Sequence, residues 1–479
     1  MKKKIARVFE KHSTLLLTLW LVILFVLYSL LSILRHNHFQ SGGFDLGLYD
    51  QGIWQYSRFL YPYNTIKERL ILGDHLNLTL PLLGPLFYLW NNVKILLLFQ
   101  SFCLTFSSLA VYLLAKKRNY SNKIALAVAF IYSFFYGLQQ AVFFDFHPVV
   151  IATGLIPWLA YFFENKKTRL TVITTVLLLA TQENMGLALV GLGCFYLFNK
   201  TLRKGAFLFI LSGAFFTFAA VKATAALSPI GFEYQPEITL NPIKNLIELF
   251  NNPEKRQVWF YSFAWFSFLP LLSPGALIAV TIDLSQYFVT GNEFARMWSP
   301  FMHHRAILAP FLALGTLEAL SLFKKRINLN YLAVLLVAVS LFLQYFFHFP
   351  LNKLIKPNYW QNEAWMSDNQ TIFREIPSTA SLAAQQNLIP HLSHRKEIYL
   401  IWPRAHDFDN NLCGQRSCWW LDFGGHPEYL VVDLHPNQWL TQLLESNENF
   451  NSAINNMEKT GKIKLIKQVN EARLYKITY

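Results

Sequence analysis

Apolar segments recur along this chain from near the N-terminus to about residue 349 and then stop. The first, 13–34, carries about twenty apolar residues, which span the ~30 Å hydrocarbon core at ~1.5 Å per residue. Only 15% of the 479 residues are charged, whereas ordinary soluble domains carry roughly 25%. The sequence therefore predicts an all-α polytopic transmembrane bundle.

The lengths of these segments set the expected layout of the bundle. Several are shorter than the ~20 residues that a simple spanning helix needs. We interpret 170–181 and 185–198 as half-helices whose break is sheltered from lipid. The segment 76–90 contains Pro81 and Pro85 and is interpreted as an interfacial helix. We expect about eleven spans, at 13–34, 94–115, 124–144, 148–163, 170–181, 185–198, 205–227, 258–272, 275–290, 305–323 and 329–349.

The distribution of charge predicts the orientation of the spans. The net charge of +14 lies wholly in residues 1–350, which hold 29 basic and 15 acidic residues. Basic residues beside apolar spans mark cytoplasmic loops, so this excess argues for a membrane topology and against a nucleic-acid partner. With 76–90 interfacial, every basic cluster falls in the cytoplasm: Lys2–Lys4, Lys116–Arg118, Lys166–Lys167, Arg203–Lys204 and Lys324–Arg326.

This orientation divides the chain between the two sides of the membrane. The N-terminus is cytoplasmic, and loops 35–93, 228–257 and 291–304 lie outside, as does the C-terminal region. We therefore expect a multi-pass protein of the cell (plasma) membrane.

The chain changes character after about residue 357. Alternating residues at 397–401 and 429–433 predict short strands, and 462–467 with 472–477 predict a hairpin. We predict two domains: a transmembrane domain, 1–350, and a small α/β or α+β soluble extracytoplasmic domain, 357–479.

Acidic residues and histidines recur in short polar stretches between the spans. Taken alone, each is expected to be a loop residue in water. Glu183 differs because it lies between two apolar runs, where an ionisable group usually faces a cavity or a partner. Asp283 raises the same question and fits a helix-packing role equally well. The predicted topology puts the main set on one side of the membrane, where we expect a site: Asp45, Asp74, His75, Asp145, His147, Glu183 and His303.

Such a set is suited to the transfer of a group from a phosphate to a hydroxyl. A carboxylate near a hydroxyl can act as general base while a bond forms to an electrophilic carbon. Histidines or Arg305 can stabilise the charge that grows on a departing phosphate. A divalent cation is also possible, but hard cations prefer all-oxygen shells and zinc prefers His-rich ones. The sequence therefore names no certain cofactor and leaves the metal unknown.

Two cysteines of the external region can be interpreted either as a disulfide or as part of a zinc site. Cys413 and Cys418 permit a disulfide outside the cytoplasm. His406 and His426 flank them, so a zinc site is the other interpretation.

Four motifs in order resemble a bacterial and archaeal membrane family called domain of unknown function 2079. They are Phe44-Asp45-Leu46-Gly47 with Asp50-Gln51, Leu72-Gly73-Asp74-His75, Asp145-Phe146-His147-Pro148 and Gln182-Glu183-Asn184. The resemblance covers most of residues 40–350, and 384–392 resembles that family's external domain. The family often has Lys-Glu-Asp at 182–184, so this chain keeps Glu183 and departs at both neighbours.

That family is similar in layout to the GT-C glycosyltransferases, which transfer sugar from a polyprenyl-phosphate carrier outside the cytoplasm. The resemblance implies that Asp45 is the base, with Asp50 or Asp145 as a second carboxylate. It also implies that His75, His147 and Arg305 face the donor phosphate. We add Glu183 to the catalytic carboxylates, His303 to the phosphate-binding residues and Asp74 as a further candidate.

The expected function is a membrane glycosyltransferase-like enzyme. It would move a hexose or pentose from a lipid-linked donor to a glycan, lipid or protein acceptor, in contact with membrane lipid. One alternative is a secondary transporter or flippase in which the same acids relay protons or bind substrate near the midplane. Another is a non-catalytic receptor whose external domain binds a ligand. Carboxylates at the outer face beside a lipid-sized groove would favour the transferase.

Overall fold

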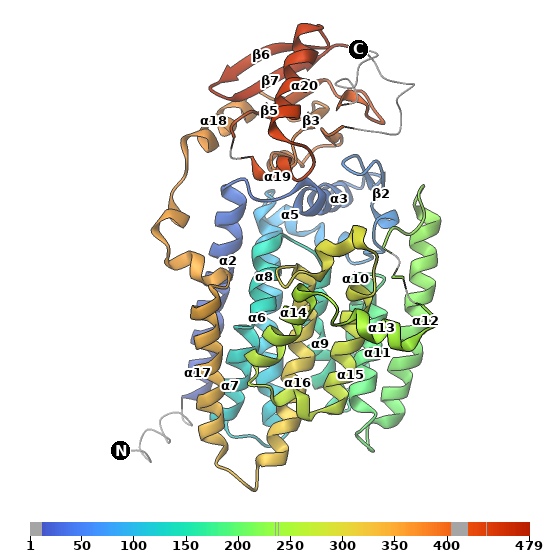
Figure 1. The fold of residues 1–479 in the computed structure, drawn as a ribbon, viewed down its shortest axis with the longest axis vertical. Helices are drawn as coiled ribbons and strands as arrows, with labels where there is room; N and C mark the ends of the chain where they lie inside the picture. The colour runs from blue at the N-terminus through green and yellow to red at the C-terminus, as the bar shows by residue number, and fades with distance from the viewer. Residues whose placement is uncertain (1–11, 235, 238, 404–419, 437) are drawn as a thin grey trace. The chain divides into compact units, whose positions relative to one another are not determined.

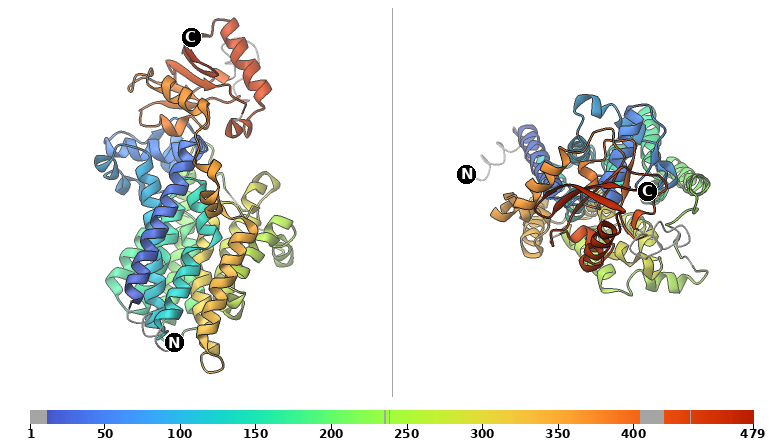
Figure 2. Two further views of the ribbon diagram at one scale, coloured as in Figure 1. Left: turned by 90° about the vertical axis from the view of Figure 1, so that its left-hand side faces the viewer. Right: turned by 90° about the horizontal axis from the view of Figure 1, so that it is seen from above.

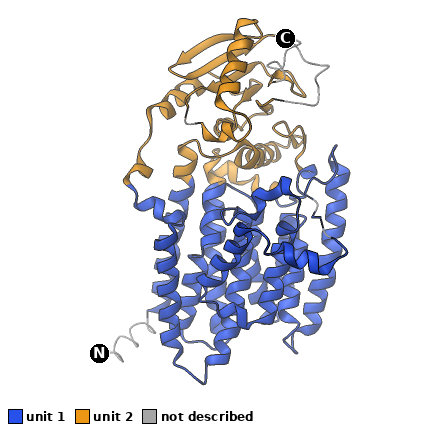
Figure 3. Cartoon of the chain, viewed as in Figure 1, with its two compact units in different colours: residues 1–32, 72–79, 97–356 blue, residues 33–71, 80–96, 357–479 orange. Residues whose placement is uncertain are grey.

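The fold comes from a computed structural model that describes residues 12–403 and 420–479, apart from 235, 238 and 437. The chain divides into two compact units (Figure 3). The first consists of Met1–Ser32, Leu72–Thr79 and Leu97–Lys356. The second consists of Ile33–Ile71, Leu80–Leu96 and Pro357–Tyr479, so it combines most of the first predicted external loop with the C-terminal region.

The first unit is a bundle of helices that run side by side (Figures 1 and 2). α2 and α6 each have one end in the second unit. The elements are α2 (Ser13–Asn37), α6 (Lys94–Lys117), α7 (Asn122–Ser133), α8 (Tyr136–Phe144), α9 (Pro148–Glu164), α10 (Thr168–Thr181), α11 (Met185–Tyr196), α12 (Arg203–Leu227), α13 (Pro242–Glu248), α14 (Pro253–Trp265), η3 (Leu269–Leu272), α15 (Pro274–Phe288), η4 (Asn292–Trp298), η5 (His303–Ile307), α16 (Leu308–Phe323), α17 (Leu329–Phe347) and η6 (Pro350–Ile355).

Six stretches of the described residues are long and apolar enough to cross a membrane. Four further apolar helical stretches are shorter: Leu80–Leu89, α9, α10 and α11. The protein is therefore a multi-pass membrane protein, whereas the count of about eleven crossings stays a prediction. The six stretches are Ser13–Asn37, Lys94–Lys117, Asn122–Phe144, Arg203–Leu227, His303–Phe323 and Leu329–Phe347.

The predicted span 124–144 is interrupted between α7 and α8. Phe135 has a non-helical backbone conformation and caps a new helix, so the carbonyl of Ile131 loses its usual partner four residues on. The indole N–H of Trp265 donates to that carbonyl at 3.0 Å. A buried side chain from α14 thus satisfies the backbone group that the break releases.

Small residues allow α11 and α12 to pack closely. A Cβ added at Gly193 would lie 2.7 Å from the carbonyl oxygen of Ala206, and one added at Gly213 would lie 3.1 Å from Val190 N. Small residues at such crossings let two backbones approach closely. Close packing of this kind stabilises helix association in a membrane, because lipid supplies no hydrophobic driving force for it.

Four turns that carry clusters of basic residues lie at one end of the first unit. The Arg118 guanidinium pairs with Glu164 at 2.5 Å, and Tyr196 also donates to Glu164 at 2.8 Å. Lys324 Nζ donates to the carbonyl of Asn119 at 3.2 Å. These contacts join the α6–α7, α9–α10, α11–α12 and α16–α17 turns, which are the turns that carry the basic clusters after Lys4.

The second unit is built on a five-stranded mixed sheet. Its order is β4-β3-β5-β7-β6, with β3 parallel to β4 and β5, and β7 antiparallel to β5 and β6. The strands predicted at 397–401 and 429–433 and the predicted C-terminal hairpin are confirmed. The strands are β3 (Leu382–Ala384), β4 (Ile398–Leu400), β5 (Tyr429–Asp433), β6 (Ile463–Val469) and β7 (Ala472–Ile477).

Each face of this sheet has its own apolar core. Leu382 and Ala384 of β3 join one cluster, which includes Ile372 of α18 (Ala364–Phe373). Ala383 faces the other cluster, with Ile454 of α20 (Asn447–Lys459). Alternate residues of a strand point to opposite faces, so a strand buried on both sides reads as continuously apolar.

The first predicted external loop packs on the α18 side of the sheet. Phe39 and Ile66 belong to the same apolar cluster as Ile372. The segment 76–90 forms only two short helices, and the remaining elements of this unit are also short. They are η1 (Gly43–Gly47), α3 (Leu48–Ser57), β1 (Tyr63–Asn64), β2 (Arg69–Leu70), α4 (Leu80–Leu83), α5 (Leu86–Leu89), η7 (Pro357–Trp360), η8 (Ile389–His391) and α19 (Trp439–Gln442), with η2 (Ile71–Gly73) at the junction of the units.

Candidate functional site

Glu183 lies in the turn between α10 and α11 and is only 2% exposed. Its Oε1 is 2.7 Å from Nδ1 of His75, and its Oε2 accepts a hydrogen bond from the backbone N–H of Leu76 at 2.9 Å. Both carboxylate oxygens are therefore engaged by one loop. A carboxylate on one nitrogen of an imidazole fixes the orientation of the ring and the position of its proton.

The loop that carries His75 is docked against two helices. The amide of Asn77 donates to the carbonyl of Thr181, the last residue of α10, at 2.6 Å. Gly73 lies against the end of α12, where an added Cβ would be 2.8 Å from the carbonyl carbon of Leu227. A larger residue at 73 would push the loop outward, so the glycine is required for this close approach.

His147 and His303 stack on each other with their ring centroids 3.7 Å apart. His147 precedes α9, and its backbone N–H donates to Gln100 Oε1 at 3.0 Å. The amide group of Gln100 also donates to the carbonyl of Asp145 at 3.0 Å. A glutamine from α6 thus holds the bend from Asp145 to His147 in place.

A polar network joins the turn after α10 to α15. Asn184 Nδ2 donates to Gln286 Oε1 at 2.9 Å and to the hydroxyl of Tyr287 at 3.1 Å. Gln286 in turn donates to Asp283, at 3.1 Å. The ring of Tyr287 stacks on His304 with centroids 4.1 Å apart. Asp283 therefore has a packing and hydrogen-bonding role in the same region.

Arg305 is fully buried. Its guanidinium donates to the carbonyl of Ser299 at 3.1 Å and to that of Met297. It also lies over the ring of Phe288, 5.1 Å from the centroid. Within the described part of the chain its Nη1 has no hydrogen-bond partner. Arg305 thus fixes the loop before η5 in place, and its Nη1 can still donate a hydrogen bond to an anion.

The first unit brings most of the predicted residues into connected contacts at one end of its helices. His75 contacts Glu183, and His147 contacts His303, while Asp74 and Asp145, which precede these histidines in the sequence, are buried. The residues that sequence reasoning missed are Gln100, Gln286, Tyr287 and His304. The sequence signal that could have identified these residues is the presence of a polar side chain inside an apolar span.

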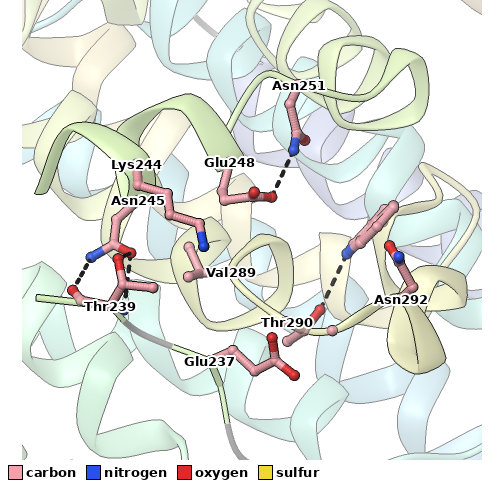
Figure 4. A pocket seen from close by; sticks show the side chains of 11 residues that line it. Glu237, Thr239, Lys244, Asn245, Glu248, Asn251, Val289, Thr290 and Asn292 are labelled. Carbon is pink, nitrogen blue, oxygen red and sulfur yellow. Dashed lines mark hydrogen bonds between the residues drawn. The ribbon is translucent and has the colours of Figure 1, made fainter. Parts of the chain in front are cut away.

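A polar cavity of about 270 Å³ adjoins this region (Figure 4). Its walls come from α13 and from the loop after α15, and they include Lys244, Glu248, Thr290 and Trp298. Trp298 Nε1 donates to Thr290 Oγ1 at 3.2 Å, which holds the loop in shape. The cavity begins two residues beyond Tyr287, so one loop contributes both to the cavity and to the network.

Asp45 and Asp50 belong to the second unit. Asp45 is half-buried on the π-helical turn η1, a kind of irregularity that is frequent at functional sites. The backbone N–H of Gly43 at the start of this turn donates to the carbonyl of Gln386 at 2.7 Å. The turn that presents Asp45 is therefore attached to the segment after β3.

Asp50 has a different environment from Asp45. It is completely buried, and it accepts hydrogen bonds from Ser393 Oγ at 2.5 Å and from His394 Nε2 at 3.0 Å. Asp50 thus joins α3 to the segment that follows η8.

No group of three or more His, Cys, Asp or Glu suited to a metal ion exists among the described residues. Cys413, Cys418 and His406 lie outside those residues. His426 is described and packs against the ring of Tyr479, with centroids 4.7 Å apart.

Comparison with known proteins identifies the family. Residues 35–452 match the family described as "Predicted membrane protein (DUF2079)". The chain belongs to this family. No match to a curated protein was found for this DUF2079 member.

Solved structures supply the fold. The DUF2079 chain is similar to ArnT from Cupriavidus metallidurans bound to undecaprenyl phosphate, with a TM-score of 0.52 and 12% identity over 95% of this chain and 97% of that one. The same protein in the apo state gives a TM-score of 0.51 and 13% identity over 96% and 98%. At 12% and 13% identity these matches show the fold alone, and the fold of the DUF2079 chain is similar to that of ArnT.

Proposed function

We propose that this protein is a membrane glycosyltransferase that moves a sugar from a polyprenyl-phosphate donor to an acceptor outside the cytoplasm. The observation that carries the proposal is the connected set of imidazoles around His147 and His303, with the buried guanidinium of Arg305 in the same helical unit. Imidazole N–H and guanidinium groups bind phosphate oxygens well. Similarity to a fold solved with undecaprenyl phosphate supports this class of donor.

The orientation of this set in the membrane is part of the proposal. His147 and His303 precede α9 and α16, whereas the basic turns follow those helices at Glu164 and Phe323. Basic turns are retained in the cytoplasm, so the histidines would lie at the opposite, outer end of the plasma membrane.

The proposed step is a displacement at the anomeric carbon of the donor sugar. A carboxylate takes the proton of an acceptor hydroxyl while its oxygen bonds to that carbon. The bond from the carbon to the phosphate oxygen breaks, and its electron pair leaves with the polyprenyl phosphate. Positive side chains stabilise the charge that develops on the departing phosphate.

The residues receive roles that fit their surroundings. Asp45 is the base, because it is the more accessible acid on the first-loop turn. Asp145 is the second carboxylate, and Asp74 remains a further candidate. The proposed phosphate-binding residues are His75, His147, His303 and Arg305.

Glu183 and Asp50 are assigned positioning roles within this proposal. Glu183 holds His75 and Leu76 through both of its oxygens. Asp50 holds Ser393 and His394. Neither carboxylate needs to touch substrate to affect the rate.

The test uses the purified full-length protein in lipid nanodiscs with a panel of radiolabelled undecaprenyl-phosphate sugars. Membranes of the host serve as the source of acceptor, and transfer is measured as label leaving the lipid carrier. Asp45→Asn should lower the rate about a hundredfold or more, because general bases contribute that much. Asp368→Asn is the matched control, since Asp368 is also half-buried in the second unit.

Two results would contradict the proposal in different ways. Transfer by Asp45→Asn at the rate of the intact protein would remove Asp45 as the base. Movement of an intact labelled carrier or solute across sealed vesicles, with no transfer from any donor, would support the transporter instead.

A further inference from the structure

The second unit contains a cavity of about 180 Å³ that none of the proposed catalytic roles uses. It is formed by the chain just before η1, by the start of α18 and by the segments around residues 387 and 438–440. Pockets for drug-sized ligands usually measure about 300–1,000 Å³, so this one suits a group the size of a single small ring. Its lining residues are His38, Phe39, Gln40, Glu363, Trp365, Met366, Asn387, Gln438, Trp439 and Leu440.

Two tryptophans give the cavity flat apolar walls. The Trp365 indole N–H donates to Glu363 Oε2 at 2.8 Å, and its ring stacks on His435 with centroids 5.5 Å apart. The orientation of Trp365 is therefore set before any ligand enters. Trp439 is 44% exposed, although the next residue, Leu440, is buried. An exposed ring on a short helix, beside a cavity, offers a face for stacking.

The polar groups of the cavity are buried and incompletely paired. Asn387 is 1% exposed, and its amide donates to Gln438 Oε1, while Gln438 Nε2 donates to Asp433 at 2.8 Å. Among the described residues, Asn387 Oδ1 and Nε2 of the buried His38 have no hydrogen-bond partner. Buried polar atoms are nearly always paired in folded proteins, so two unpaired atoms on residues that line one cavity point to a ligand.

The lining restricts the chemical class of that ligand. The charged side chain on the lining is Glu363, with no lysine or arginine among the lining residues, which disfavours phosphate and carboxylate groups. A quaternary ammonium could stack on the rings but has no N–H for the Asn387 oxygen. A hydroxyl both donates and accepts, so it can pair with Asn387 Oδ1 and with either tautomer of His38. Rings with hydroxyl edges and apolar faces match this combination.

The cavity shares chain segments with the turn that presents Asp45. Residues 38–40 are separated by one residue from Gly42, whose added Cβ would lie 3.2 Å from Gln386 Nε2. Gln386 in turn precedes Asn387, which lines the cavity. We infer that this cavity binds one neutral sugar residue of the acceptor, a specificity role that rests on the proposed transferase function.

A binding experiment tests the cavity without requiring catalysis. Saturation-transfer NMR on the full-length protein in nanodiscs would use the methyl glycosides of glucose, galactose, mannose and arabinose as probes, with choline and inorganic phosphate as comparison ligands. At least one glycoside should bind, and Trp439→Ala should weaken it about tenfold, as expected for the loss of one aromatic contact. Trp90→Ala is the matched control, because Trp90 is also 44% exposed but lies outside the cavity.

The variants separate loss of binding from loss of folding. Trp439→Phe keeps an aromatic face and should retain most of the affinity, with an unchanged melting temperature. The inference is overturned if no glycoside binds, if Trp439→Ala binds as the intact protein does, or if choline or phosphate displaces the glycoside. Ordered water alone in the cavity would give the first of these results.

A transfer experiment tests the role of the cavity separately. In the donor assay, Trp439→Ala should raise the KM for acceptor and leave hydrolysis of the donor by water unchanged. If glycosides bind through Trp439 but no donor is ever consumed, the transferase function fails while the sugar site remains. If transfer occurs and its KM does not respond to Trp439, the acceptor role fails alone.

Discussion

Nδ1 of His75 lies 2.7 Å from Oε1 of Glu183, across 108 positions of sequence. The carboxylate is nearly inaccessible to solvent, and its second oxygen is occupied by the backbone of Leu76. This arrangement makes Glu183 a support for an imidazole and its loop. It also explains why an acidic residue is retained between two apolar helices, where an unpaired carboxylate would cost several kcal/mol.

The first prediction concerns Glu183→Gln. The amide can still accept from one partner, but it cannot hold His75 and Leu76 as the carboxylate does. We expect kcat to fall about 10- to 100-fold, the usual loss when the support of an imidazole is removed. The KM for acceptor should change little. The assay is transfer from undecaprenyl-phosphate sugars in nanodiscs.

Glu318→Gln provides the control for that measurement. Glu318 is half-buried in the helical unit and, like Glu183, accepts a hydrogen bond, in this case from Ser273. Ser273 caps the start of α15, at the end of that helix away from Tyr287. An equal loss of kcat in both variants would mean that Glu183 acts through general stability of the bundle.

The second prediction concerns Asp50→Ala. The change removes the acceptor for Ser393 and His394, leaving the Ser393 hydroxyl buried and the His394 ring partly buried without it. Hydrogen bonds to a charged group contribute roughly 1.5–3 kcal/mol each, so the second unit should be destabilised by roughly 3 kcal/mol. Limited proteolysis of the segment after residue 357 measures the loss.

Asp50→Asn distinguishes the positioning role from a catalytic one. The amide keeps one oxygen acceptor and nearly the same volume, so most of the stability should return. Recovery of transfer together with stability supports positioning. Stable protein with transfer still lowered a hundredfold would assign Asp50 to the reaction itself.

Periodicity and composition predicted the elements that they physically determine. The strand at 429–433 was predicted from alternating residues, and the structure places β5 at Tyr429–Asp433. The long apolar helices were predicted from the length of uninterrupted apolar runs. Alternation and apolar runs indicate which faces of a segment are buried, and this information lies within the segment's own sequence.

The partners of the polar residues could not be predicted in this way. Asp50 contacts Ser393 at a separation of 343 residues, and no local pattern encodes that choice. The break at Phe135 is stabilised by Trp265, whose position depends on the packing of a distant helix. Gln100 looked like one polar residue in an apolar span, and only the folded bundle reveals that it holds the Asp145–His147 bend.

The third prediction is a pH dependence of stability that arises from His391. Burial, with a smaller contribution from the positive charge of Lys94, lowers the pKa of His391 from its usual value near 6.5 to about 3. The folded protein therefore keeps this ring neutral, while the unfolded chain takes up a proton below about pH 6.5. Stability should fall as the pH drops through this range, by roughly 1.4 kcal/mol per pH unit between about 6 and 4.

His391→Phe isolates this contribution. The variant keeps a ring to stack on Phe39 but has nothing to protonate. Its melting temperature should fall less steeply than that of the intact protein between pH 6 and pH 4. His426→Phe, at an exposed position, should leave the slope unchanged. Equal slopes for the intact protein and His391→Phe would contradict the assignment.

The fourth prediction concerns orientation, on which the outer location of the histidines depends. Single cysteines at Lys117, Lys325 and Thr460 would be introduced after the native cysteines are replaced, and all three positions are exposed. In sealed cells a membrane-impermeant maleimide should label Thr460→Cys alone. The other two should react only after the membrane is permeabilised, because basic turns are retained in the cytoplasm. Labelling of Lys325→Cys from outside would put the basic end of the helices at the outer face, and the donor phosphate would then have to be bound from the cytoplasmic side.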